Sequence, residues 1–523
     1  MLVRRLPILE LAKFPTFVAT LLLAGWQCWP LRVAQFGPVD DHRFAVFRGG
    51  RFNVLVDGFI NAFKSLANIG RTPVFRPVIG VESGLAGAIF GITPSGVFTF
   101  VFIKYFIALI LIGILARQLI TFLAAPMVIK GWAQEAIVCS IVVAAASINA
   151  WQGIVPRTGP SESLLALGLL LAASSVLRIS VSEDLTSVNV LLLFVGVIIS
   201  AGSKESGIAS VIFLIIVARP LIVMSSRSKV LRSGVSLGVL TCAIFPIHAI
   251  LFTILGQPDL YGTARGPSTI IQSLSERVTS PMLLVLILAV LVIRSSIPGT
   301  AKNRREFLTF IGALLLIWIM DGAIYELDSP NLRYRMVYQI IEVLLLSTAL
   351  VSGFIAHFQS PRHQVLGVVL FFFALNVLAV PINATQTLRD VNQATADATS
   401  SYWTLVEAVA KESRKQQRPV VLFSFDAAAS YEPIVALSAY LRYLDVDSPI
   451  GVFNAEPSDE VWNSPEWLAV QAMQENGGSN LVSPLRSVSN ETWICVGFSY
   501  TLDNPDGPLF ELVGERCESI LRI

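Results

Sequence analysis

Charged residues are scarce in this 523-residue chain: they make up 14% of it, whereas 54% of the residues are hydrophobic. This balance excludes disordered and collagen-like proteins. Cysteine is also rare, and five cysteines in so long a chain cannot form a disulfide framework. The net charge of only +2 lacks the basic surplus typical of nucleic-acid binding. The mean hydropathy of +0.68 instead predicts an α-helical polytopic membrane protein.

Several common site motifs are missing as well. The four histidines are scattered, and no His/Cys spacing resembles a zinc site. The sequence contains no Walker loop and no GxGxxG segment. These absences argue against P-loop nucleotide hydrolysis and dinucleotide binding.

Charge is distributed unevenly along the chain. Residues 1–380 carry 29 Lys and Arg against 17 Asp and Glu, whereas residues 381–523 carry 9 against 19. We therefore predict two domains, a transmembrane domain over 1–381 and an acidic domain over 382–523.

Apolar runs in the first domain predict eleven membrane spans, since a bilayer core about 30 Å thick needs roughly 20 apolar residues per helix. The predicted spans are 14–31, 97–116, 135–154, 162–177, 188–202, 208–224, 234–256, 281–297, 306–322, 338–357 and 364–381.

The orientation follows from the distribution of Lys and Arg in short loops. With the N-terminus inside, fifteen Lys and Arg fall in cytoplasmic segments and six in the four short outer loops. An odd number of spans then places the acidic domain outside the cytoplasmic (inner) membrane.

Two outer segments are more than connectors. Residues 32–96 form a long first outer loop, in which the mixed pattern of Phe44 to Leu66 suits a helix lying in the membrane interface. The acidic domain combines strand-like runs at 419–425, 449–455 and 493–499 with helical patterns at 390–416 and 431–444, which predicts a small α/β domain.

Charged side chains gather in four outer segments, which is what a site for a lipid-linked phosphate at the outer leaflet would require. Adjacent carboxylates can supply a base or hold a cation, whereas arginine and lysine can neutralise phosphate oxygens. The residues are Asp40, Asp41 and His42; Arg71 and Arg76; Lys204 and Glu205; and Arg333, Tyr334 and Arg335.

Two further features have ordinary explanations. Lys104 falls inside the second span, close enough to its outer end for the ammonium group to reach the interface. Cys495 and Cys517 both lie in the outer domain, where an oxidising compartment would permit a disulfide, and their pairing stays open.

The order of these segments resembles a known family. The runs DDHRFAVF (40–47), FRPVIGV (75–81), LAGAIFG (85–91) and SKESGI (203–208) are similar to motifs of the C-type (GT-C) membrane glycosyltransferases, closest to the protein O-mannosyltransferase-like branch. The resemblance covers about residues 14–340. The chain departs from that branch in its tail, which shows no tetratricopeptide pattern.

The resemblance implies an inverting transferase that moves a sugar from a polyprenyl-phosphate donor to a hydroxyl of a glycan or protein acceptor outside the membrane. Asp40 and Asp41 match the paired catalytic acids, Lys204 and Glu205 the K-E pair, and Arg76 the R-P arginine. Arg71, Arg333 and Arg335 join Lys204 and Arg76 as phosphate ligands by location, with Glu205, Tyr334 and His42 in support. The cofactor is unknown: none is required by the sequence, and a divalent metal on Asp40 and Asp41 is left open.

Two other functions stay open on the sequence alone. A membrane transporter could enclose a substrate path among eleven spans, although we find few charges within them and no broken helices in corresponding halves. A polysaccharide polymerase or ligase acting on lipid-linked glycans would favour an Arg-rich later loop, and residues 257–280 hold only Arg265 and Arg277.

Overall fold

The computed structural model describes most of the predicted membrane domain and part of the tail. The described residues are 15–37, 44, 50–69, 75–123, 132–158, 161–181, 186–226, 228–254, 301–324, 332–359, 382–416, 420–424, 431–446, 450–454, 494–498 and 510–512. The predicted spans 281–297 and 364–381 lie outside them, as do Asp40, Asp41, His42, Arg71 and Cys517.

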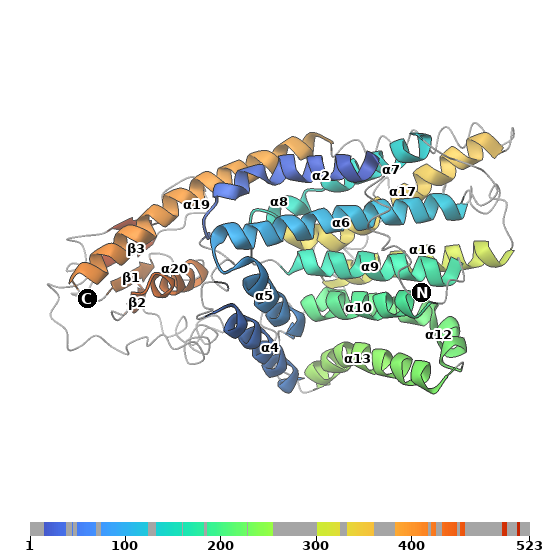
Figure 1. The fold of residues 1–523 in the computed structure, drawn as a ribbon, viewed down its shortest axis with the longest axis horizontal. Coiled ribbons are helices and arrows are strands. Elements are labelled where there is room, and N and C mark those ends of the chain that lie inside the picture. The colour runs from blue at the N-terminus through green and yellow to red at the C-terminus, as the bar shows by residue number, and fades with distance from the viewer. Residues whose placement is uncertain are drawn as a thin grey trace.

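The membrane domain is a bundle of helices that run side by side along the long axis of the molecule (Figure 1). In chain order the bundle contains α2 (Pro15–Cys28), η1 (Trp29–Val33), α6 (Pro94–Leu123), α7 (Trp132–Ala146), α8 (Ala150–Ile154), α9 (Glu162–Val181), α10 (Ser187–Ser203), η2 (Glu205–Val211), α11 (Ile212–Ile216), α12 (Ala218–Ser225), α13 (Lys229–Ile254), α16 (Ala301–Ile324), η3 (Leu332–Arg335) and α17 (Met336–Gln359). A large cluster of buried aliphatic and aromatic side chains forms its core, and buried polar residues such as Gln27, Ser175 and Asn189 lie in the same helices.

Every predicted span within the described residues coincides with one or more of these helical elements. Within the described part, α6, α9 and α13 are long and apolar enough to cross a membrane, and α12 joins the preceding segment as a bent pair that passes the same test. Together with the composition, these helices indicate a multi-pass membrane protein. The count of eleven spans stays a prediction.

Two predicted spans are broken. The third is divided between α7 and α8 by residues 147–149, and the sixth bends by 60° at Val217. A hydropathy average over a whole span reveals neither break, although the first one falls at the polar residues Ser147 and Asn149. By contrast, α6 has 30 residues and extends well beyond the predicted span 97–116.

Small residues allow a close contact between α9 and α10. A Cβ atom on Gly168 of α9 would lie 2.4 Å from the amide nitrogen of Ser200 in α10 and 2.6 Å from the carbonyl oxygen of Gly196. Only glycine therefore permits this approach of the two backbones. The contact fixes how the ends of α9 and α10 meet.

The segment predicted as the first outer loop contains two packed helices, α4 (Arg51–Ala67) and α5 (Pro77–Phe90). The predicted interface helix begins at Arg51 rather than at Phe44, and Phe44 is fully buried in a separate cluster. On α4, Phe52 and Phe63 are 74% and 67% exposed, whereas Val54 is buried. The helix thus keeps an apolar outer stripe of the kind that suits a membrane interface.

The tail begins with the long helix α19 (Ile382–Gln416), which lies along α2 and continues beyond the bundle to a small sheet (Figure 1). The sheet contains β1 (Val420–Ser424), β2 (Ile450–Asn454), β3 (Ile494–Phe498) and β4 (Phe510–Leu512), in the order β2-β1-β3-β4. β1 pairs in parallel with β2 and β3, and β4 is antiparallel to β3. α20 (Tyr431–Tyr443) connects β1 to β2.

The three strand-like runs of the tail are β1, β2 and β3, and the predicted helix 431–444 is α20. The pattern missed β4, whose three residues are too short to show a period. The division of the chain into two domains stays a prediction.

Candidate active site

Two of the predicted outer segments meet where α10 ends and α5 begins. Phe75 packs against Ala201 and Phe245 in a small buried cluster. A Cβ atom on Gly202 would lie 2.5 Å from Cγ2 of Val78, so the Val78 side chain packs directly on the backbone of Gly202. The R-P segment at Arg76 and the K-E segment at Lys204 are therefore neighbours in space.

The local fold of the K-E segment explains its glycine. Lys204 is extended (φ −157°, ψ 153°) and ends α10, after which η2 folds back on the helix. The amide of Gly207 donates to the carbonyl oxygen of Lys204 at 2.9 Å. A Cβ atom on Gly207 would lie only 2.0 Å from the carbonyl oxygen of Ser200. Any side chain at position 207 would displace η2 and with it Lys204.

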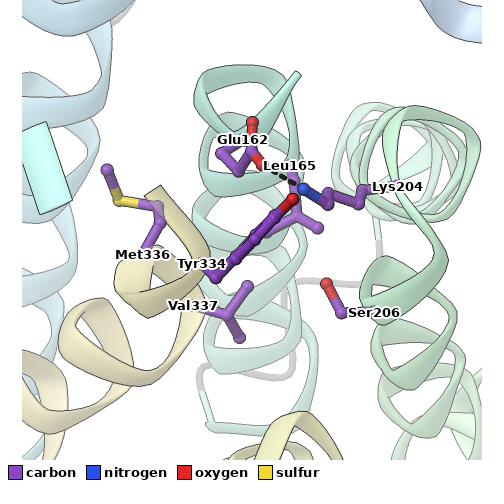
Figure 2. A pocket seen from close by; sticks show the side chains of 7 residues that line it. All are labelled: Glu162, Leu165, Lys204, Ser206, Tyr334, Met336 and Val337. Carbon is purple, nitrogen blue, oxygen red and sulfur yellow. Dashed lines mark hydrogen bonds and ion pairs between the residues drawn. The ribbon is translucent and has the colours of Figure 1, made fainter. Parts of the chain in front are cut away.

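A small pocket lies between the K-E segment (Lys204 and Glu205) and the R-Y-R segment (Arg333, Tyr334 and Arg335) (Figure 2). Its lining consists of Glu162, Leu165, Lys204, Ser206, Tyr334, Met336 and Val337. The ammonium group of Lys204 forms an ion pair with Glu162, and it lies 4.3 Å from the centre of the Tyr334 ring. The pocket encloses about 170 Å³, including the part open to solvent. This figure includes open solvent and still falls below the roughly 300–1,000 Å³ typical of ligand sites, so the pocket is narrow and its side chains would have to separate to admit a ligand group.

The charges of the pocket are almost completely buried. The side chains of Lys204 and Glu162 are 6% and 5% exposed. Removing an ammonium and a carboxylate from water is costly, and the ion pair offsets that cost only while both partners are present. Glu162 lies in the first turn of α9, where the helix dipole favours a negative charge. The pocket therefore contains a buried ammonium group whose partner is a carboxylate at a helix N-terminus.

The remaining predicted site residues fall into three groups. Arg76 is half-buried at the start of α5, and Arg335 is half-buried at the end of η3 beside the pocket residue Tyr334. Glu205 and Arg333 lie in η2 and η3, and their side chains are outside the described part. Asp40, Asp41, His42 and Arg71 fall outside the described residues altogether.

Phe36 and Phe44 lie on either side of the acidic pair in the sequence, and both are buried. Phe36 and Phe44 share a cluster with Ala86 of α5, Val97 of α6 and aromatic residues of α19 and α20. The segment that carries Asp40 and Asp41 therefore begins and ends beside the helices that lead to the pocket.

The interpretation of Lys104 as a snorkelling residue is wrong. Its Nζ atom lies 2.5 Å from Oε1 of Glu82 on α5, and both side chains are buried, at 4% and 2% exposure. The ring of Phe100 lies 5.0 Å from the ammonium group. The sequence did not reveal this pair, because Glu82 was part of a loop with no assigned helix.

Sequence reasoning also missed Glu162. Glu162 is the first residue of the predicted fourth span, 162–177, and a charge at the end of a span needs no special explanation. A carboxylate at the outer end of an apolar helix, on the same side as Lys204, was the available signal. Within the described part of the chain, no three His, Cys, Asp or Glu residues come together as a metal site.

The sequence matches no protein-family model, and a search of curated proteins gives no match either. Among solved structures, the chain is similar to the crystal structure of ArnT from Cupriavidus metallidurans bound to undecaprenyl phosphate. The TM-score is 0.43 and the sequence identity 10%, over 92% of this chain and 92% of that one. A likeness of this degree carries no argument about the chemistry, which has to be made from the residues.

Proposed function

We propose that the protein transfers a sugar from a polyprenyl-phosphate donor to an acceptor hydroxyl at the outer face of the cytoplasmic membrane. One observation carries the proposal: the K-E and R-Y-R segments, far apart in the sequence, line a single pocket at one end of the bundle. The R-P segment lies beside the same helix end. These are the cationic segments that a phosphate site was expected to need.

The donor phosphate is bound by Lys204, with Arg76 and Arg335 as neighbouring cations. Lys204 provides a compact charge, whereas a guanidinium group offers two parallel donors to phosphate oxygens. Tyr334 orders the ammonium group through its ring, at 4.3 Å. The pocket is narrow as it stands, so its side chains separate to admit the phosphate, and the sugar and the lipid stay outside it.

The transfer is a single displacement. The acceptor hydroxyl oxygen bonds to the anomeric carbon, the bond from that carbon to the phosphate oxygen breaks, and the configuration inverts. Asp40 takes the hydroxyl proton, with Asp41 in support, and the lipid phosphate leaves with the electron pair. Positive charge from Lys204 stabilises the oxygen on which negative charge develops. Glu162 holds Lys204 in place while the site is empty.

The first test is donor turnover by the purified protein in detergent, with a panel of radiolabelled polyprenyl-phosphate sugars. Asp40→Asn keeps the size of the side chain and removes its charge, so we expect turnover to fall by about 10² to 10⁴, the usual contribution of a general base. Binding of a non-hydrolysable donor analogue should survive. Normal turnover in the double variant Asp40→Asn and Asp41→Asn would retire the carboxylate assignment.

The same panel separates the alternatives. A polymerase or ligase would consume lipid-linked oligosaccharides rather than single-sugar donors. A transporter would leave every donor chemically intact while it moved a solute into vesicles.

A further inference from the structure

The C-terminal tail contacts the first outer segment through an aromatic cluster. Tyr440 of α20 is completely buried, and its ring is stacked on Phe36 with 5.7 Å between the centres and 6° between the planes. Its hydroxyl donates a hydrogen bond of 2.5 Å to the carbonyl oxygen of Gly37. Trp403 of α19 meets both rings edge to face.

A second hydrogen bond holds the same segment from α19. The amide nitrogen of Gln35 donates to Oγ1 of Thr399 at 3.1 Å. Three consecutive residues of the first outer segment, 35 to 37, are therefore held by side chains of the tail.

The N-terminal part of α19 is itself bound to the bundle, at the end of α2. Asn392 donates to the carbonyl oxygen of Gln27 at 2.9 Å, and Arg389 donates to that of Trp26 at 2.6 Å. These carbonyls lie in the last turn of α2, where helix geometry leaves them without partners in the helix. α19 thus caps α2 and continues as one helix to the cluster around Tyr440.

The other flank of the acidic pair joins the same cluster. Phe44 is fully buried there, together with Ala86 and Val97 of the bundle and Tyr440 of the tail. Gly37 and Phe44 are only seven positions apart in the sequence. The chain between them, which includes Asp40 and Asp41, therefore starts from and returns to one anchored cluster.

We infer that α20 acts as a positioning element for this segment, with Tyr440 as the positioning residue. The inference rests on the proposed function, in which Asp40 and Asp41 are the catalytic acids. A displacement of about 1 Å in a reacting group can lower a rate by as much as 10²-fold, so anchoring both flanks contributes directly to turnover. The tail then has a role in the reaction that does not require it to touch the donor.

The test uses Tyr440→Phe in the full chain. This change keeps the ring stacked on Phe36 and removes the hydroxyl group that donates to Gly37. We expect kcat to fall by about 2- to 10-fold, the range that corresponds to one hydrogen bond. The dissociation constant of a non-hydrolysable donor analogue should stay unchanged, because the phosphate pocket lies on other elements.

Tyr443→Phe is the matched control. Tyr443 is on the same helix and meets the same Phe36 ring edge to face, at 6.0 Å, so its hydroxyl can be removed without touching the bond to Gly37. It should keep the wild-type kcat. Thr399→Val, which removes the bond from Gln35, tests the same anchor independently and should also lower kcat at unchanged donor affinity.

The outcomes are distinguishable. A wild-type protein that turns over no donor of the panel contradicts the proposed function. An active wild type, with Tyr440→Phe and Thr399→Val both equal to Tyr443→Phe in kcat per folded molecule, overturns the positioning role alone. A merely structural role would lower the thermal midpoint and the fraction of folded protein while kcat per folded molecule stayed constant.

Discussion

Two buried lysine–glutamate pairs of the membrane domain have the same chemistry and different surroundings. Lys104 pairs with Glu82 where α5 packs on α6, and a phenylalanine ring covers the ammonium group. Lys204 pairs with Glu162 at the ends of α10 and α9, and a tyrosine ring lies over the ammonium group. Only the second pair lines the pocket described above.

The comparison separates burial from function. A buried charge inside a membrane protein is a candidate site by default. Both pairs meet that criterion, and their exposed fractions are nearly equal. What distinguishes Lys204 is its position where separate segments meet beside an opening, with the Tyr334 ring and the hydroxyl group of Ser206 around it. Each pair is therefore the best control for the other.

The largest expected effect concerns the side of the membrane on which the pocket end of the bundle and the tail lie. The proposed function requires the pocket end of the bundle to be outside, with the tail. A reporter that is active only outside the cytoplasm should give a full signal when fused after Ile523 and none when fused after Arg232. If both fusions report the same side, the orientation derived from the Lys and Arg bias is wrong, and the pocket loses its access to an outer-leaflet donor.

Single replacements of lysine should destabilise both regions to a similar extent. Lys204→Met and Lys104→Met each leave a buried carboxyl that must stay charged without its partner or take up a proton. Breaking a buried pair in this way typically costs about 3–5 kcal/mol. Thermal unfolding in detergent should show a clear loss for both variants. A loss at Lys104 only would mean that water already reaches the pocket pair.

Much of this fold could be predicted from the sequence, because membrane helices are marked by long apolar runs. The positions of Lys204 and Tyr334 at helix ends on one side of the membrane could be predicted too, and the two residues do meet at one end of the bundle. The pairing of Lys104 could not. It depends on α5, whose apolar residues and glycines within the first outer loop do not distinguish a packed helix from a connector.

The role of the tail was equally hidden. The patterns of the tail predicted three strands and α20, but contacts of Tyr440 with Phe36 and Gly37 join positions about 400 residues apart. No local period carries that information. Glu162 escaped for a different reason, since a terminal carboxylate has an ordinary explanation until a buried lysine is found beside it.

Neutral double replacements should separate the two regions by donor binding. Lys204→Met with Glu162→Gln, and Lys104→Met with Glu82→Gln, remove both charges of a pair and leave no charge without a partner, so each should cost little stability. Only the pocket variant should bind a non-hydrolysable donor analogue more weakly, by about 1.5–3 kcal/mol, the range for hydrogen bonds to charged groups.

The pair on α5 and α6 makes this experiment interpretable. Equal loss of affinity in the two double variants would indicate a general effect of charge removal on the bundle. Unchanged affinity in the pocket variant, with wild-type thermal stability, would remove Lys204 from the phosphate site.

The smallest expected effect concerns the aromatic rings beside the two lysines, Tyr334 at Lys204 and Phe100 at Lys104. Tyr334→Leu removes the aromatic face beside Lys204 and should weaken donor binding by about 0.5–2 kcal/mol, the usual value of a cation–π contact. Tyr334→Phe keeps that face, so it should retain most of the affinity if the ring orders the ammonium group. Phe100→Leu makes the equivalent change at Lys104 and should leave donor affinity unchanged. If Tyr334→Phe weakened binding as much as Tyr334→Leu, the hydroxyl rather than the ring would be the group that matters, and Tyr334 would be a direct phosphate ligand instead of a support for Lys204.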